Sequence, residues 1–241
     1  MKLDQLFSDA KEHLSFLGIC FLIILVIFLL AKVSERMIHM PKNPKIRTRK
    51  IAVIGIFAAI SGVLMSMEIP LWFAPPFYQL DFSELPVMIC AFAYGPFAGV
   101  AAELCKVFIK LLLKGTSTAF IGDLANFIVG CTLILPTSII YHIKKSKKAA
   151  VTGMCTGIVT MTVAGSFFNA IYLIPAFSNL FGMPLDAIVE MGTVVNSKIT
   201  SVHTLVFYAV VPFNLLKGLV VSMITFLLYK PLSPMIHASS N

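Results

Sequence analysis

Leu80–Gly130 reads LDFSELPVMICAFAYGPFAGVAAELCKVFIKLLLKGTSTAFIGDLANFIVG, and this stretch decides the fold. It places seven polar residues inside or beside strongly apolar segments: Asp81, Glu84, Glu103, Lys106, Lys110, Asp123 and Asn126. A charge at the middle of a membrane helix costs roughly 2.5–3.5 kcal/mol on insertion scales. Such residues persist mainly where they line a bundle interior, a cavity or a pathway. The stretch therefore predicts a chain that holds something polar within a bilayer.

The composition around this stretch is that of an integral membrane protein. Of the 241 residues, 58% are hydrophobic and 12% are charged, whereas a soluble domain carries about 25% charged residues. A soluble fold could not bury such a surplus of apolar surface. The length allows about six or seven spans of ~20 residues and leaves no room for a large soluble domain.

The net charge of +8 comes largely from two basic clusters that lie directly against apolar segments. One comprises Lys32, Arg36, Lys42, Lys45, Arg47, Arg49 and Lys50, and the other comprises Lys144, Lys145, Lys147 and Lys148. This pattern is typical of cytoplasmic loops of membrane proteins. No aromatic-basic interleaving accompanies the charge, so we expect the partner to be the lipid bilayer and not a nucleic acid.

The apolar segments predict an all-α integral membrane protein, a six-helix transmembrane bundle plus one extra N-terminal transmembrane helix. The extra helix is the continuous apolar run Leu14–Ala31. The predicted parts are the extra helix (1–34), a basic cytoplasmic linker (35–50), the six-helix substrate-binding domain (51–231) and a cytoplasmic tail (232–241). The six spans of the bundle are expected at about Ile51–Met67, Ser83–Tyr94, Phe97–Leu113, Ala119–Ile143, Ala149–Ile174 and Leu205–Tyr229.

Counting spans predicts the orientation, because four of them separate the two basic clusters and so bring both to the same side. The N-terminus is then expected outside and the C-terminus in the cytoplasm. The outer segments include Glu68–Leu80, whose prolines predict a structured but non-helical loop. Its aromatic residues, among them Trp72 and Tyr78, suit either a membrane anchor or a lid over a pocket that opens outward. Another outer segment, Pro175–Thr204, is expected to hold a short helix near Leu185–Asn196.

Asn214 and Lys217 lie three residues apart in the last span, so they share one helical face. Lys217 has no acid in its own segment, so it needs a carboxylate from another helix or the carbonyl oxygens of a ligand. Asn126 and Asn169 lie near the outer ends of their spans. Each amide offers a donor and an acceptor, which suits a heterocycle with alternating carbonyl and N–H groups. Hydrogen bonds between helices are the alternative for both.

Glu103, Lys106 and Lys110 form a stripe on one helical face, which favours a structural or partner-facing network over substrate contact or a proton relay. In IAVIGIFAAISGVL, the pairs Gly55/Ala59 and Ala58/Gly62 form small faces that allow close helix packing or docking to another membrane subunit.

Several motifs of catalysis are absent from the sequence. There is no P-loop for ATP, no HExxH and no GxSxG. The five cysteines never form a CxxC pair, and the histidines lack metal-ligand spacing. We therefore expect no enzyme activity, no cofactor and no metal in this chain.

Five ordered blocks carry a family resemblance that covers about Lys50–Pro231: LDFSELP, AYGPFAGVAAELCK, GTSTAFIGDLANFIVG, NAIYLIP and PFNLLKG. In these blocks the chain resembles the substrate-binding S components of the bacterial energy-coupling-factor (ECF) vitamin transporters, specifically the riboflavin-specific branch. The extra helix Leu14–Ala31 departs from the six-helix pattern of that family.

The resemblance implies a bundle that binds riboflavin from outside, in a pocket under the first loop of the bundle. The asparagine and lysine of the PFNLLKG block and the asparagine of NAIYLIP would hydrogen-bond the isoalloxazine edge, and the backbone at Leu124 would lie near the ligand with Asn126 supporting it. The predicted ligand-binding residues are these five, Lys217, Asn214, Asn169, Leu124 and Asn126, together with Tyr78 from the aromatic outer loop.

The resemblance also implies partners. Gly55 and Ala59 would dock on a membrane T subunit, and two separate ATPase subunits would supply the energy. One alternative is an S component for another vitamin or heterocycle; thiamine fits poorly, because its cation would be repelled by Lys217. The other alternative is a stand-alone membrane carrier that uses Glu103 and Lys106.

Overall fold

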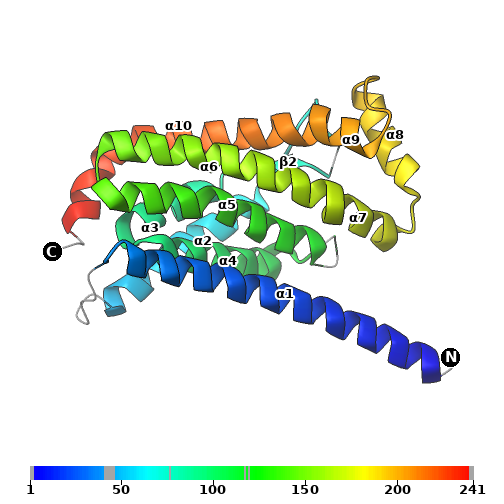
Figure 1. Ribbon diagram of the computed structural model, residues 1–241, viewed down its shortest axis with the longest axis horizontal. Coiled ribbons are helices and arrows are strands. Elements are labelled where there is room, and N and C mark those ends of the chain that lie inside the picture. The colour runs from blue at the N-terminus through cyan, green and yellow to red at the C-terminus, as the bar shows by residue number, and fades with distance from the viewer. Residues whose placement is uncertain (1–2, 41–46, 76, 117, 119, 239–241) are drawn as a thin grey trace.

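The computed structural model describes residues 3–40, 47–75, 77–116, 118 and 120–238, which form an elongated bundle of helices (Figure 1). The first half of the chain contributes α1 (Leu3–Met37), α2 (Arg47–Ser66), α3 (Glu84–Tyr94), α4 (Pro96–Lys114) and α5 (Ile121–Lys144). We call residues 67–83, between α2 and α3, the hairpin loop. Its strands β1 (Ile69–Pro70) and β2 (Gln79–Leu80) pair antiparallel, so the predicted non-helical loop is confirmed in its described residues.

The second half of the chain forms two long rods, each interrupted by a π-helical turn. The first rod is α6 (Lys147–Phe168), η2 (Asn169–Leu173) and α7 (Ile174–Phe181). The second is α9 (Val202–Leu205), η3 (Val206–Val210) and α10 (Val211–Ala238). The short helix predicted near Leu185–Asn196 is present as α8 (Leu185–Val195), between the rods.

The predicted membrane spans each correspond to a helix or a rod of the structure. Within the described residues, five of these are long and apolar enough to cross a membrane: α1, α2, α5 and the two rods. The other two are α3, which has 11 residues, and α4, which carries the charged stripe. The predicted all-α architecture of six bundle helices and one added helix is therefore confirmed.

One predicted boundary is wrong. The span expected to end at Ile174 continues to Phe181, straight through Pro175. Pro175 lies in the first turn of α7, directly after the π turn η2. A proline is tolerated at such a position because its missing N–H removes no regular helical hydrogen bond. Residues 175–181 thus belong to a helix and not to an outer loop.

Helix α3 occupies the centre of the bundle, and nine of its 11 residues are buried. It reaches α4 through a tight turn in which Gly95 adopts φ +97° and Pro96 begins the next helix. Its apolar side chains pack with those of α4, α5, α6 and α10 in one cluster that includes Phe92, Ile134 and Met161. This arrangement brings both ends of the LDFSELP block into the protein interior.

The added helix α1 lies against α4 and α5 through a second cluster around Ala31. Phe28 meets Phe97 edge to face at 5.5 Å. Glu35 accepts a hydrogen bond from the backbone N–H of Phe97 at 3.3 Å and pairs with Lys50 at 3.4 Å. The contacts join α1 to the α3–α4 turn and to the start of α2.

The ends of the helices place both basic segments at one end of the molecule. Figure 1 shows the end of α1, the start of α2, the α5–α6 connection and the end of α10 together at the left, with α8 at the opposite end. This agrees with the prediction that the two clusters share a side. Helices α1, α2 and α10 extend into the stretches 35–50 and 232–241 that were predicted to be linker and tail. Residues 41–46 and 239–241 of those stretches, and Pro76 of the loop, lie outside the described residues.

Candidate ligand-binding site

A cavity of about 550 Å³ lies beneath the hairpin loop, between α4, α5, α7, α8 and α10. Its walls combine apolar and polar side chains. The apolar ones are Met65, Phe77, Tyr78, Ala125, Val129, Leu173, Phe177, Phe181, Met183, Ile188, Met191 and Phe213, together with Gly122. The polar ones are Glu68, Gln79, Asp81, Glu84, Lys110, Thr118, Asp123, Asn126, Asn169, Asn214 and Lys217. An apolar slot with a few fixed polar groups is typical of small-molecule sites.

The hairpin loop closes one side of the cavity with aromatic side chains. The Tyr78 hydroxyl donates to Asn169 Oδ1 at 2.6 Å, and its ring packs on Phe213 at 5.5 Å between centroids. Phe77 lines the cavity next to it, whereas the Trp72 side chain is 89% exposed. The two interpretations of these aromatics thus apply to different residues: Tyr78 and Phe77 cover the cavity, and Trp72 faces outward.

Three asparagines point into the cavity from three different elements. Asn169 of η2 accepts a hydrogen bond from Tyr78 and donates one to the Gly165 carbonyl at 2.7 Å. Asn214 Nδ2 of α10 and Asn126 Oδ1 of α5 are buried and have no hydrogen-bond partner among the described residues. Buried polar atoms in native proteins are nearly always paired. The amides of Asn214 and Asn126 therefore present a free donor and a free acceptor to whatever fills the cavity.

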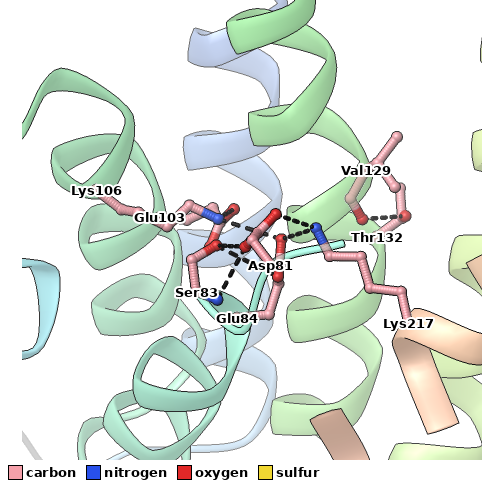
Figure 2. Close-up of polar contacts among 8 residues, drawn as sticks. All are labelled: Asp81, Ser83, Glu84, Glu103, Lys106, Val129, Thr132 and Lys217. Atoms are coloured by element: carbon pink, nitrogen blue, oxygen red, sulfur yellow. Dashed lines mark hydrogen bonds and ion pairs between the residues drawn. The ribbon is translucent and has the colours of Figure 1, made fainter. Parts of the chain in front are cut away.

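Lys217 enters the cavity from α10 and is held by two acids from the other side of the bundle. Figure 2 shows its Nζ atom between Asp81 Oδ2, at 2.9 Å, and Glu84 Oε1, at 3.0 Å. Asp81 Oδ1 accepts from the backbone N–H of Ser83 at 2.9 Å and from its hydroxyl. Of the two alternatives left open for Lys217, a carboxylate from another helix is thus present in Glu84 of α3, and Asp81 of the hairpin loop adds a second one. Lys217 also lines the cavity, and its contact with a ligand stays a prediction.

Behind these residues the charges continue as a buried network. Lys106 lies 2.5 Å from Glu103 and 3.3 Å from Glu84, and all three side chains are at most 1% exposed (Figure 2). We call Asp81, Glu84, Glu103, Lys106 and Lys217 the ion cluster. Glu103 and Lys106 are not among the described residues that line the cavity. Their placement agrees with the structural network favoured for this stripe and counts against a carrier that uses them for substrate contact.

Lys110, the third member of the stripe, has a different environment. It pairs with Asp123 of α5 at 2.6 Å, and both side chains line the cavity. The second carboxylate oxygen of Asp123, Oδ2, is buried without a hydrogen-bond partner in the described part of the chain. This pair adds a second polar wall at the start of α5.

Leu124 differs from the other five predicted ligand-binding residues. Its side chain packs into the apolar cluster around Ala31, Met65 and Phe127, and it is not among the cavity-lining residues that the structure describes. Its neighbours Asp123 and Ala125 do line the cavity. The prediction concerned the backbone at Leu124, and that contact remains a prediction.

The two small pairs predicted on α2 lie on overlapping faces of the helix but differ in their surroundings along its length. A Cβ atom on Gly62 would lie 2.5 Å from the side chain of Ile109, so the Ala58/Gly62 face packs against α4. Around Gly55 there is nothing within 4 Å of such an atom, and Gly55 and Ala59 are both exposed. The Gly55/Ala59 face is therefore free to meet another helix.

Asp81, Glu84 and Asp123 line the cavity but were not among the residues predicted to bind the ligand. In the sequence, all three stand out only as polar residues in apolar surroundings. A usable signal was present, because Asp81 and Glu84 have no basic neighbour in their own segment, just as Lys217 has no acidic one.

In the part of the chain that the structure describes, no group of three or more His, Cys, Asp or Glu side chains is arranged to hold a metal ion.

Comparisons with known proteins show the family of the chain. Residues 49–229 match the family model of the ECF transporter substrate-specific component. The riboflavin transporter RibU of Staphylococcus aureus (strain TCH60) is 31% identical over 200 residues, which is 83% of this chain and 96% of that protein. The riboflavin transporter FmnP of Bacillus subtilis (strain 168) is 29% identical over 192 residues, 79% of this chain and 95% of that protein. A solved structure of the S component of a bacterial ECF transporter superposes with a TM-score of 0.62 at 29% identity, covering 79% of this chain and 98% of that chain.

Proposed function

We propose, on the premise that this chain belongs to the family of ECF transporter substrate-specific components, that it binds riboflavin for an ATP-driven vitamin importer. The two relatives compared above, at 29% and 31% identity, are riboflavin transporters. The proposal also covers the place of binding, which is the cavity beneath the hairpin loop.

The free polar atoms in the cavity wall are the observation that carries this assignment. The isoalloxazine ring is a flat apolar body with one edge of alternating carbonyl and N–H groups. The cavity offers the unpaired donor Asn214 Nδ2 and the unpaired acceptor Asn126 Oδ1, and Lys217 lies three residues from Asn214 on the same helix. Aromatic side chains such as Phe77, Tyr78 and Phe213 suit the ring faces. A volume of about 550 Å³ lies within the range of small-molecule sites.

The proposed partners follow from family membership. A membrane T subunit would dock on the exposed Gly55/Ala59 face of α2, and two ATPase subunits would hydrolyse ATP, since this sequence has no P-loop. The chain itself would perform no catalysis and hold no cofactor, with riboflavin as the transported ligand. It would span the bacterial cell membrane with its N-terminus outside and the basic end of the bundle in the cytoplasm, so that the cavity opens outward.

Asn214→Asp tests the site. The change replaces a donor by a negatively charged acceptor, so a ring carbonyl at this position is repelled. Leaving a buried group without its hydrogen-bond partner costs about 1–3 kcal/mol, and we expect riboflavin affinity to fall about fivefold to a hundredfold. Equilibrium titration of the purified protein, followed by quenching of flavin fluorescence, measures it.

Asn179→Asp is the matched control, because Asn179 is exposed near the end of α7 and the change adds the same charge. The riboflavin affinity of the Asn179→Asp variant should equal that of the unmodified protein. Equal affinity in the Asn214 variant would remove that residue from the site.

A parallel titration with FMN, thiamine and biotin addresses the alternative ligands. Tighter binding of thiamine or biotin than of riboflavin would replace the proposed substrate.

A further inference from the structure

The ammonium group of Lys217 has a limited number of hydrogen bonds to give. A lysine has three N–H donors and no acceptor. Asp81 Oδ2 and Glu84 Oε1, at 2.9 and 3.0 Å, engage two of them. Lys217 has no further partner among the described residues, and its side chain also lines the cavity. One donor is therefore left for a molecule in the cavity.

The two acids are themselves fixed by neighbours that lie farther from the cavity. Ser83 holds Asp81 through its backbone N–H, at 2.9 Å, and its hydroxyl. Lys106 holds Glu84 at 3.3 Å, through the same Oε1 atom that meets Lys217. Figure 2 shows this chain of contacts running from Lys217 across Asp81 and Glu84 to Lys106 and Glu103. All five residues of the ion cluster are buried.

A lysine with four methylene groups and no such anchor samples many rotamers, and a ligand must then fix it on binding. An ammonium group that is already held in place loses little freedom when a carbonyl oxygen meets it. The two acids thereby preorganise a donor, which is the condition for a strong contact at a fixed place.

We propose that Asp81 and Glu84 are positioning residues for flavin binding, which hold Lys217 so that its remaining N–H faces the ligand. This rests on the proposed function, because it takes riboflavin as the molecule that fills the cavity. It adds a role for the LDFSELP block: the end of the hairpin loop sets the position of a side chain on α10. The loop then contributes to recognition through Lys217 as well as through Tyr78.

A double-mutant cycle between Asp81→Asn and Lys217→Met tests the proposal. If Asp81 acts through Lys217, Asp81→Asn weakens riboflavin binding by about tenfold. The same change should cause no further loss when Lys217 is already Met. A direct bond from Asp81 to the ligand, or a general structural role, would instead cost the same in both backgrounds.

The visible absorption band of bound flavin gives a readout that a structural role does not move. An ammonium donor at the ring edge shifts this band, so Lys217→Met should change it. Asp81→Asn should shift the band in the same direction, towards the spectrum of the Lys217 variant. Glu190→Gln is the charge control: it removes one negative charge from an exposed position of α8 and should leave both affinity and spectrum unchanged.

Ser83→Ala covers the case in which Asp81→Asn does not fold. It removes the hydroxyl that holds Asp81 without changing any charge, so a smaller loss of about threefold is expected, again absent in the Lys217→Met background. Unchanged affinity and spectrum in the Asp81 and Ser83 variants, or equal losses in both backgrounds, would overturn the proposal. If the unmodified protein itself fails to bind riboflavin, the proposed function fails instead, so the two failures are distinguishable.

Discussion

Single glycines set how closely the helices of this bundle approach. Gly153 of α6 lies so near to α5 that a Cβ atom would be 2.7 Å from the Thr137 carbonyl oxygen. The Thr137 hydroxyl donates to Leu133 O at 2.7 Å and also reaches Gly153 O at 3.1 Å, which bridges the two helices. Small residues at such seams allow backbone contact between membrane helices.

Gly153→Ala should therefore lower the unfolding temperature of the purified protein. The added methyl meets a backbone atom that cannot turn away, and overpacking of this kind costs about 1–3 kcal/mol. Gly55→Ala is the matched control in another helix, because nothing lies within 4 Å of its added methyl. Helix propensity alone favours alanine there by about 1 kcal/mol. An unchanged unfolding temperature for the Gly153 variant would contradict the close seam.

At the scale of elements, the two π turns share one arrangement. Each ends two residues before a proline: η2 ends at Leu173 before Pro175, and η3 ends at Val210 before Pro212. Each also precedes or contains cavity residues, with Asn169 in η2 and Asn214 shortly after η3. A π turn is a one-residue insertion into a helix and often occurs at functional sites. Here the insertions set the direction in which the cavity amides point.

Deletion of Ile171 tests the role of η2. The deletion removes the inserted residue, so α6 and α7 keep their relative rotation and the protein should fold. Asn169 then loses the turn that holds its bonds to Tyr78 and Gly165, so we expect riboflavin affinity to fall by about tenfold. Thermal unfolding and flavin titration measure the two effects.

The control is deletion of Val159, which is also apolar and exposed but lies in the regular part of α6. This deletion rotates everything after it by about 100° relative to the rest of the helix. The rotation turns the buried face of the rod outward, so this variant should not fold. If both deletions behave alike, the π turn has no special role.

For the whole molecule, the added helix α1 lies outside the family match, which begins at residue 49. It contacts α4 and α5 around Ala31 and is joined to the α3–α4 turn by Glu35. None of its described side chains lines the cavity. Much of its surface is apolar and exposed, as Phe21 and Leu30 are, which suits contact with lipid.

Removal of residues 1–46 should leave riboflavin affinity within about twofold of the intact chain, because the cavity walls remain. The unfolding temperature should fall modestly, since lipid or detergent replaces α1 at little cost in apolar contact and the Glu35 bonds are lost. Titration and thermal unfolding of the shortened protein check both. A large loss of affinity would mean that α1 shapes the site from a distance.

Composition and hydropathy were sufficient to predict the membrane class and the number of spans. They also predicted that the two basic clusters share a side and that polar residues lie within the apolar segments. Such features are local, because a membrane helix must satisfy its own backbone and match the thickness of the bilayer. Block spacing was sufficient for the family. Five of the six residues predicted to bind the ligand line the cavity, and their contact with a ligand stays a prediction. Local patterns also indicated that Lys217 needed a partner.

The identity of that partner depended on the packing of the whole bundle. Asp81 is 136 residues away from Lys217, and no local pattern relates them. They meet because α3 lies at the centre of the bundle and the hairpin loop folds over the end of the cavity beside α10. The continuation of the helix through Pro175 also depended on tertiary context. The π turn just before this proline means that its missing N–H removes no regular helical hydrogen bond. Long-range pairings and irregular turns depend on which surfaces come together in three dimensions, so they required the folded structure.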